Sequence, residues 1–421
     1  MEPRTVVRRR TLESLLLDRG VRDDHRVVEV LHPSLRETLR DGPSRDAFYA
    51  VPYALAYAGE LVRAYGLLRE AAELVRADDA DLADYLEQRA RDLLSNDYEA
   101  GDAAWITGRF ARLNAQIGAY ETYDDHLLGQ KAFFGMSILI RAAGEGSEEI
   151  ERGIAQLAEH EAALPGGPYE RVRAEIPIGI YDVLADFGQA RGGNTASILP
   201  NEAHIIRKYG RTILIRRNVL TSPAIAAVRQ ARFRAAVAPA HESDLGDMGY
   251  FDRTVWHEVG HYLGPKRTED GRDVTTALGN LHNHLEELRA DLISLWLIPR
   301  LIEAGAMTEE RDRSAYAAGV LRTLLSRAPQ RENAYATMQL MQNVWLLEHG
   351  ALVFEGGRLT IDYARYPAAV SAMLAEVLRI QRAGDRAAAE AFVSRWARWD
   401  DSVHGVIGPR ARRGRPPLLA A

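Results

Sequence analysis

The chain has 421 residues, too many for one simple core, and this length predicts two domains. Its hydrophobic content of 47% and charged content of 27% are typical of a globular protein in water, and its net charge of -6 disfavours nucleic acid or an acidic membrane surface as a partner. The absence of cysteine excludes disulfides, thiolate metal sites and a cysteine nucleophile, so a metal site would need histidine and carboxylate ligands.

The first 20 residues contain no convincing targeting segment. Arg8, Arg9 and Arg10 are basic, but the following residues are interrupted by charges and form no sustained apolar core, unlike a signal peptide. Elsewhere no apolar stretch approaches the 18 residues of a membrane span. We therefore expect a cytoplasmic protein without a membrane partner.

The first half of the chain divides into a helical segment and a mixed segment. Residues 1–100 are expected to form an N-terminal helical segment, since apolar residues recur at intervals of three and four between Ala47 and Leu94. Residues 101–240 are expected to form a strand-containing lobe with helices near 130–164. Within that lobe the composition predicts strands at 211–217 and 232–239 and a glycine-rich loop at 185–197.

Residues 241–405 are expected to form a second, helical lobe, followed by a tail at 406–421. One helix is expected from Thr254 to Leu263, ending at Gly264-Pro265, and a longer one from Thr275 to Ile298, ended by Pro299. Further helices are expected at about 308–326, 331–349, 366–383 and 386–398.

The segment 255–265 contains His257-Glu258-Val-Gly-His261. Residues four apart lie on one face of a helix, so both imidazoles can bind one cation. Glu258 follows the first ligand, where its carboxylate can act as general base on a water molecule. A solvated amphipathic helix with two histidines is the alternative interpretation.

The acidic cluster at residues 286–291, which begins 29 residues after His257, provides a candidate third ligand on a second helix. This second cluster favours zinc over the solvated helix. His282 and His284 lie about one turn before Glu287, but we expect them to be residues of the helix face and not ligands. A metzincin is excluded, because its third histidine would be at Arg267.

Three ordered blocks of this sequence resemble the dipeptidyl peptidase III family of zinc metallopeptidases. Glu286-Glu-Leu-Arg-Ala-Asp291 is similar to the family's Glu-Glu-Cys-Arg-Ala-Glu/Asp motif. Ile117-Gly-Ala-Tyr-Glu-Thr-Tyr resembles its Ile-Gly-x-x-Glu-x-Tyr block, and Leu199-Pro-Asn resembles its Leu-Pro-Asn segment. The resemblance covers roughly residues 100–405, and the short HExxH spacing is similar to that of the forms linked to Nudix hydrolases.

The resemblance implies one Zn²⁺ per chain, with His257, His261 and Glu287 as ligands and Glu258 as the residue that activates water. It further implies that Glu286 orients His261 and that Asp291 orients His257.

For the substrate, the resemblance implies that Tyr123 is a catalytic residue that stabilises an oxyanion, while Glu121 and Asn201 bind the amino end of a peptide. Ordinary strand packing and a surface carboxylate are the alternatives for Tyr123 and Glu121.

Two departures from the family's pattern concern the substrate. Ile198 stands where the family has an asparagine, and Tyr335 stands where the family has a catalytic histidine on a later helix. Tyr335 is therefore a candidate substrate-binding residue, and the substrate is expected to differ from a conventional peptide.

The sequence thus predicts a mainly helical α+β protein of two lobes, with zinc held in the helical lobe and the active site in the cleft. The leading hypothesis is a zinc metallohydrolase, similar to an aminopeptidase, that cleaves an amide or ester of a peptide or small molecule. One alternative is a zinc Lewis acid for non-hydrolytic chemistry, such as a cyclisation or lyase step. Another is an inactive binding protein, which the presence of Glu258 disfavours. The oligomeric state is left open.

Overall fold

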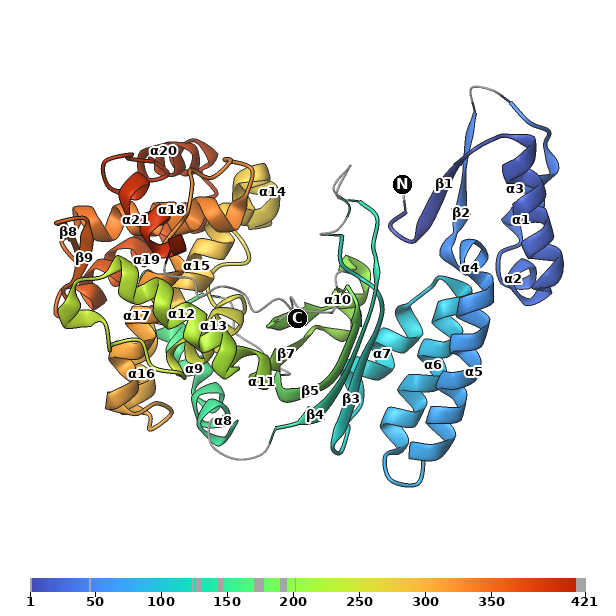
Figure 1. Ribbon diagram of the computed structural model, residues 1–421, viewed down its shortest axis with the longest axis horizontal. Helices are drawn as coiled ribbons and strands as arrows, with labels where there is room; N and C mark the ends of the chain where they lie inside the picture. Colours follow the sequence, from blue (N-terminus) through green and yellow to red (C-terminus); the bar gives the residue numbers. More distant parts are fainter. Residues whose placement is uncertain are drawn as a thin grey trace. The chain divides into compact units, whose positions relative to one another are not determined.

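The computed structural model describes residues 2–44, 47–122, 125, 130–142, 147–169, 178–189, 195–200 and 202–413. The chain forms two compact units (Figure 1). Unit 1 consists of residues 1–141 and 177–214, and unit 2 consists of residues 142–176 and 215–421. The segment expected at 101–240 therefore contributes to both units.

Unit 1 contains a five-stranded sheet with the strand order β3-β4-β5-β7-β6. Its strands β3, β4 and β5 pair antiparallel, and a bulge at Ile138/Leu139 shifts the register between β4 and β5. The strands are β3 (Leu113–Ala119), β4 (Phe134–Arg141), β5 (Ile178–Gly188), β6 (Ala196–Leu199) and β7 (Thr212–Arg216).

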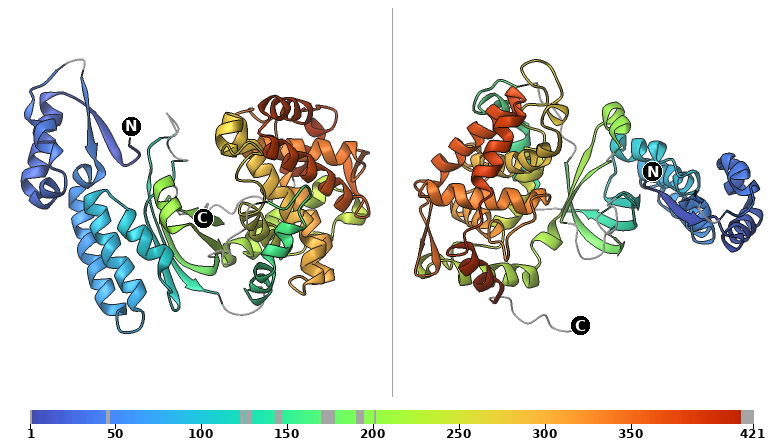
Figure 2. Two further views of the ribbon diagram at one scale, coloured as in Figure 1. Left: turned by 180° about the vertical axis from the view of Figure 1, so that it is seen from behind. Right: turned by 90° about the horizontal axis from the view of Figure 1, so that it is seen from above.

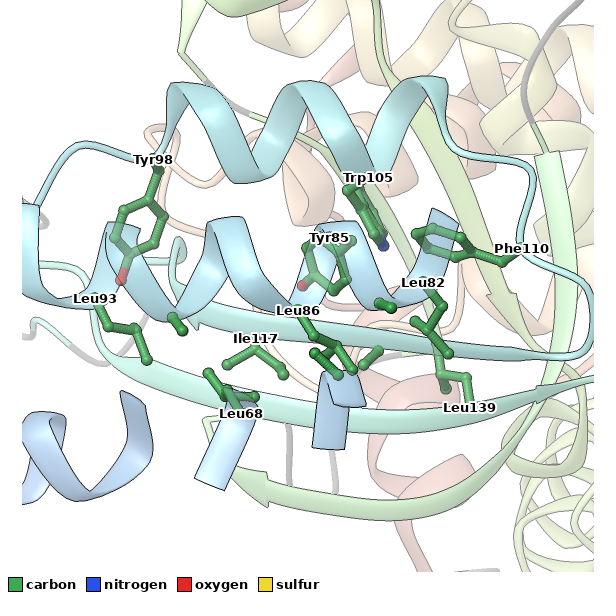
Figure 3. Packing of buried hydrophobic residues seen from close by; sticks show 14 of the residues in the cluster. Leu68, Leu82, Tyr85, Leu86, Leu93, Tyr98, Trp105, Phe110, Ile117 and Leu139 are labelled. Atoms are coloured by element: carbon green, nitrogen blue, oxygen red, sulfur yellow. The ribbon is translucent and has the colours of Figure 1, made fainter. Parts of the chain in front are cut away.

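Three helices cover one face of this sheet: α5 (Ala58–Val75), α6 (Ala80–Ser95) and α7 (Glu99–Thr107). Figure 3 shows their apolar side chains packed against Ile117 of β3 and Leu139 of β4. In α6 the buried residues, among them Leu82, Leu86 and Leu93, recur at helical spacing, so one apolar stripe faces the sheet. This burial holds β3 in place, and the segment after β3 contains Glu121.

An N-terminal subdomain of unit 1 begins with a strand pair that the sequence did not predict. Strand β1 (Thr5–Arg9) pairs antiparallel with β2 (Phe48–Pro52). The remaining elements of unit 1 are α1 (Leu12–Asp24), α2 (Arg26–Leu31), α3 (Ser34–Arg40), α4 (Tyr53–Ala56) and α10 (Ala203–Tyr209).

Unit 2 is built around α15 (His282–Trp296), which contacts α13 (Gly249–Gly260), α18 (Ala334–Glu348) and α19 (Tyr366–Ala383) (Figure 2). From Leu288 to Trp296 every residue of α15 is buried, including the charged residues Arg289 and Asp291, so these two side chains need partners inside unit 2. The other helices of unit 2 are α8 (Ser147–Ala155), α9 (Leu157–Ala162), α11 (Arg217–Leu220), α12 (Pro223–Ala236), α14 (Val274–Leu278), α16 (Ile298–Glu303), α17 (Asp312–Arg322), α20 (Arg386–Trp396) and α21 (His404–Arg413).

A short hairpin and three 3₁₀ turns complete unit 2. Strand β8 (Leu352–Glu355) pairs antiparallel with β9 (Arg358–Ile361). The 3₁₀ turns are η1 (Pro239–His241), η2 (Gly279–Leu281) and η3 (Glu309–Arg311). Helix α21 continues to Arg413 and packs against α12, so part of the expected C-terminal tail is helical.

Several expected elements differ from the observed ones. The strand expected at 232–239 is wrong, because residues 223–236 form α12, in which Phe233 and Ala236 are buried on one helical face. The expected loop at 185–197 is wrong over residues 185–188, which belong to β5, and over residues 196–197, which belong to β6. The strand expected at 211–217 is confirmed by β7.

The predicted fold class, α+β and mainly helical, is confirmed: the sheet lies in unit 1 and the HExxH segment lies in the helical unit 2. Among the described residues, no helix combines the length and apolar character that crossing a bilayer requires.

Candidate metal centre

Helix α13 presents the two histidines of the HExxH segment on one face. His257 and His261 have ring centroids 4.9 Å apart, and His257 is only 3% exposed. Asp252, in the first turn of α13, forms an ion pair with Arg311, which ties the start of the helix to η3. The helix is thus fixed at the end opposite to the histidines.

Gly260 allows α13 to approach α15 closely. A Cβ atom at Gly260 would lie 2.8 Å from the carbonyl oxygen of Ala290 and 2.9 Å from its Cα atom. Both contacts are to backbone, which cannot turn away as a flexible side chain would. A glycine between the two histidines is therefore needed to bring Glu287 of α15 within reach of them.

Three potential ligand atoms meet between these helices. The Oε2 atom of Glu287 lies 3.4 Å from Nε2 of His257 and 3.9 Å from Nε2 of His261. Within the described part of the chain, these three residues are the one such group with ligand atoms within 4.8 Å of one another. A tetrahedral zinc with bonds of about 2.0–2.2 Å has ligands roughly 3.3–3.6 Å apart. The distance from Glu287 to His257 lies within this range and the distance to His261 lies slightly above it, so the residues present fit zinc in chemistry and come close to its spacing.

The ring nitrogens facing away from this point lie near two further carboxylates. Asp291 Oδ1 lies 2.8 Å from Nδ1 of His257, and Glu286 Oε1 lies 3.2 Å from Nδ1 of His261. Arg289 donates a hydrogen bond of 2.6 Å to Glu286. Such carboxylates fix the tautomer and the orientation of a metal-binding histidine. These are the pairs that the sequence resemblance implies, and their roles stay a prediction.

The charges of the cluster shift the pKa values of its members. Burial lowers the pKa of His257, but Asp291 and Glu287 outweigh burial and raise it to about 9. Burial raises the pKa of Glu287, whereas hydrogen bonds and charges from His257, His261 and Tyr335 outweigh it and lower that pKa below its usual value. In the metal-free protein a proton on His257 thus compensates part of the negative charge.

The other candidate site residues are placed as follows. Glu258 is partly buried and follows His257 on α13. Tyr335 is the second residue of α18, is 53% exposed, and forms a hydrogen bond to Glu287 that lowers the pKa of this carboxyl. Glu121 is partly buried, follows β3 in unit 1, and accepts a backbone hydrogen bond from Phe133 through its carbonyl oxygen.

Tyr123 and Asn201 lie outside the described residues. Of the two histidines near Glu287, His284 is buried and its Nε2 lies 2.6 Å from the carbonyl oxygen of Arg331. The Nε2 atom of His282 lies 3.2 Å from Oγ1 of Thr275. Neither histidine joins the group of ligand atoms.

The residues that surround Asp291 are not among those that the sequence predicted for the site. Arg253 of α13 forms an ion pair with Oδ2, Arg322 of α17 lies 3.2 Å from Oδ1, and Gln342 of α18 donates a hydrogen bond of 3.2 Å to Oδ2. Burial raises the pKa of Asp291, but the two arginines outweigh it and hold that pKa well below its usual value. These residues come from three helices, and no local sequence motif links them.

Glu161 of α9 is a second residue that was not identified. Its two carboxylate oxygens accept the backbone N–H of Gly264 at 3.2 and 3.0 Å. Gly264 has a φ of +89°, which favours glycine, and it ends the turn that follows His261. Glu161 therefore fixes the chain just after the second histidine.

Comparisons with known proteins agree with the resemblance noted in the sequence. No protein-family model matches the chain. Nudix hydrolase 3 of Arabidopsis thaliana is 27% identical over 368 residues, which cover 84% of this chain but only 46% of that protein. This chain therefore spans less than half the length of the curated relative that it matches.

Two solved structures share the fold. Dipeptidyl peptidase III of Caldithrix abyssi superposes with a TM-score of 0.81 at 24% identity, over 94% of this chain and 77% of that chain. Dipeptidyl peptidase III of Corallococcus sp. strain EGB gives a TM-score of 0.72 at 28% identity, over 87% of this chain and 69% of that chain. The resemblance to dipeptidyl peptidase III is thus confirmed, and this chain is similar in fold to these two proteins over most of its length.

Proposed function

We propose that this protein is a zinc-dependent hydrolase of the metallopeptidase type. The observation that carries the proposal is the approach of His257, His261 and Glu287 to one point, with Glu258 beside the first of these residues. The similarity to two dipeptidyl peptidases III supports hydrolysis as the reaction. The presence of Glu258 also disfavours the hypothesis of an inactive metal-binding protein, because metal binding does not need this carboxylate.

His257, His261 and Glu287 would hold the zinc. Bound there, zinc would supply a Lewis acid that polarises a substrate carbonyl and makes a water molecule more acidic. Glu258 would accept the proton of that water and pass it to the leaving group. Asp291 and Glu286 would keep the rings of the two histidines in the tautomer that presents Nε2.

The proposed substrate is an amide or ester that lacks the free amino terminus of a peptide, or binds it differently. Recognition of a free ammonium group needs several acceptors, since a desolvated charge left partly unpaired is costly. Glu121 and Asn201 supply two candidate acceptors, whereas Ile198 is apolar. Tyr335 near Glu287 also differs from the catalytic histidine of the family. We therefore expect weak or no cleavage of dipeptidyl-arylamides.

The test uses Glu258→Gln on a panel of peptides, arylamides and esters. The variant should keep its metal and lose turnover, because glutamine cannot accept the proton. Glu269→Gln is the matched control, since Glu269 is exposed and lies outside the motif, and it should behave as wild type. Zinc-dependent turnover that survives Glu258→Gln would refute the assignment of the base.

Non-hydrolytic zinc chemistry is the second candidate, because Tyr335 in place of the family's catalytic histidine does not choose between the two reactions. Turnover in ¹⁸O-labelled water separates the two reactions. Hydrolysis places one labelled oxygen in the product, whereas a cyclisation or lyase step places none. A labelled product would exclude the second candidate, and an unlabelled product would exclude hydrolysis.

A further inference from the structure

Asp291 is the centre of a buried charge cluster that contains more positive than negative charge. Arg253 and Arg322 both pair with this single carboxylate, so the three side chains together have a net charge of +1. The side chains of Asp291 and Arg253 are fully buried, and that of Arg322 is 12% exposed. Water therefore screens the excess charge only weakly.

The excess positive charge lies beside the candidate metal ligands. The carboxylate oxygen that faces Arg322, Oδ1 of Asp291, is also the one that lies 2.8 Å from Nδ1 of His257. Arg322 in addition interacts electrostatically with Glu287 and Glu258. The guanidinium of Arg322 thus acts on three groups of the site. These are the carboxylate that pairs with His257, the candidate ligand Glu287 and the candidate base Glu258.

Arg253 already neutralises the charge of Asp291. A hydrogen bond of 2.6 Å to Ser294 fixes Arg253 in place. Gln342 occupies Oδ2 as well. The carboxylate is therefore held without Arg322. A second arginine is not needed for its position, and it makes the surroundings of a dication more positive.

A carboxylate next to a metal-binding histidine makes that histidine a stronger donor. Two arginines on the same carboxylate reduce this effect, since they draw its negative charge toward themselves. The bound metal then receives less electron density from His257. It is held less tightly, and it is a stronger Lewis acid.

We infer that Arg322 is a positioning and tuning residue of the metal centre, whose charge weakens zinc binding and so keeps the metal strongly electrophilic. This inference rests on the proposed zinc site. It predicts an effect opposite to that of a structural residue: removal of Arg322 should tighten zinc binding, whereas loss of a structural support would weaken it.

The test measures the zinc affinity of the metal-free, full-length protein by competition with a chromophoric chelator at pH 8. Arg322→Met keeps the apolar stem and removes the charge, and we expect the dissociation constant for zinc to fall on the order of 10-fold.

Two further variants complete the experiment. Arg322→Lys restores a positive charge and should return the dissociation constant toward that of wild type. Arg313→Met is the matched control, since Arg313 is an exposed arginine of the same helix α17, and it should leave zinc affinity unchanged.

The outcomes are distinct. Weaker or unchanged zinc binding in Arg322→Met, together with stoichiometric binding in wild type, would overturn this inference and leave the proposed function standing. Failure of the wild-type protein to bind zinc would overturn both. Thermal unfolding of the metal-free variants identifies any variant that does not fold. If Arg322→Met does not fold, Arg322→Gln removes the charge in its place: tighter zinc binding supports the inference, and weaker or unchanged zinc binding refutes it.

Discussion

Asp291→Asn tests how much the buried charge cluster contributes to the stability of unit 2. The substitution keeps the shape of the side chain but removes its charge, and it leaves Arg253 and Arg322 without their common counter-ion. Removing one partner of a buried ion pair costs about 3–5 kcal/mol, because the remaining charge stays buried. We therefore expect the free energy of unfolding of unit 2 to fall by this amount at pH 7.

Urea unfolding of the metal-free protein, followed by tryptophan fluorescence, measures this loss. Five of the six tryptophans belong to unit 2, and Trp105 belongs to unit 1, so the signal reports mainly on the unit that contains Asp291. Glu376→Gln is the control: it breaks an exposed pair with Arg379 and should cost less than about 1 kcal/mol. A cost below 1 kcal/mol for Asp291→Asn would refute the reasoning.

Three further predictions concern packing, pH and catalysis. Gly260→Ala should push α13 away from Ala290, lower the stability of unit 2 by about 1–3 kcal/mol and weaken zinc binding. Gly59→Ala in α5 is the control: an added Cβ atom there would contact no other atom, so this variant should not destabilise the protein. Burial raises the pKa of Asp92 to about 7, above its usual 3.8. The stability that the protonated carboxyl contributes is therefore full below about pH 4 and is lost as the pH rises through 7. The melting temperature of wild type should decline over this pH range, and Asp92→Asn should remove the decline. Tyr123→Phe should lower turnover by about 100- to 1,000-fold with little change in melting temperature, and a large loss of stability at near-normal rate would contradict the catalytic role.

Local patterns predicted the elements that contain the candidate ligands. The HExxH spacing placed His257 and His261 on one helix face, and the helical pattern from Thr275 to Ile298 predicted a second helix that contains Glu287. Both are local properties of helical periodicity. The approach of the two helices depends on Gly260, whose importance is visible only against the backbone of Ala290.

The errors have a physical origin as well. Phe233 and Ala236 lie three residues apart, which places them on one face of a helix but on opposite faces of a strand. Both are buried within unit 2, as the helical spacing requires. Arg253, Arg322 and Glu161 could not be identified, because their partners lie between 31 and 103 residues away along the chain. A buried arginine has no sequence signature of its own.

The most direct measurement for the whole account is the zinc content of the purified full-length protein after dialysis. Wild type should retain one zinc per chain, and Glu287→Ala should retain none, because two histidines alone do not hold zinc in a catalytic site. Glu310→Ala, at an exposed position of η3, serves as the control and should keep its zinc. Full zinc in Glu287→Ala, or none in wild type, would contradict the assignment of His257, His261 and Glu287 as the metal centre.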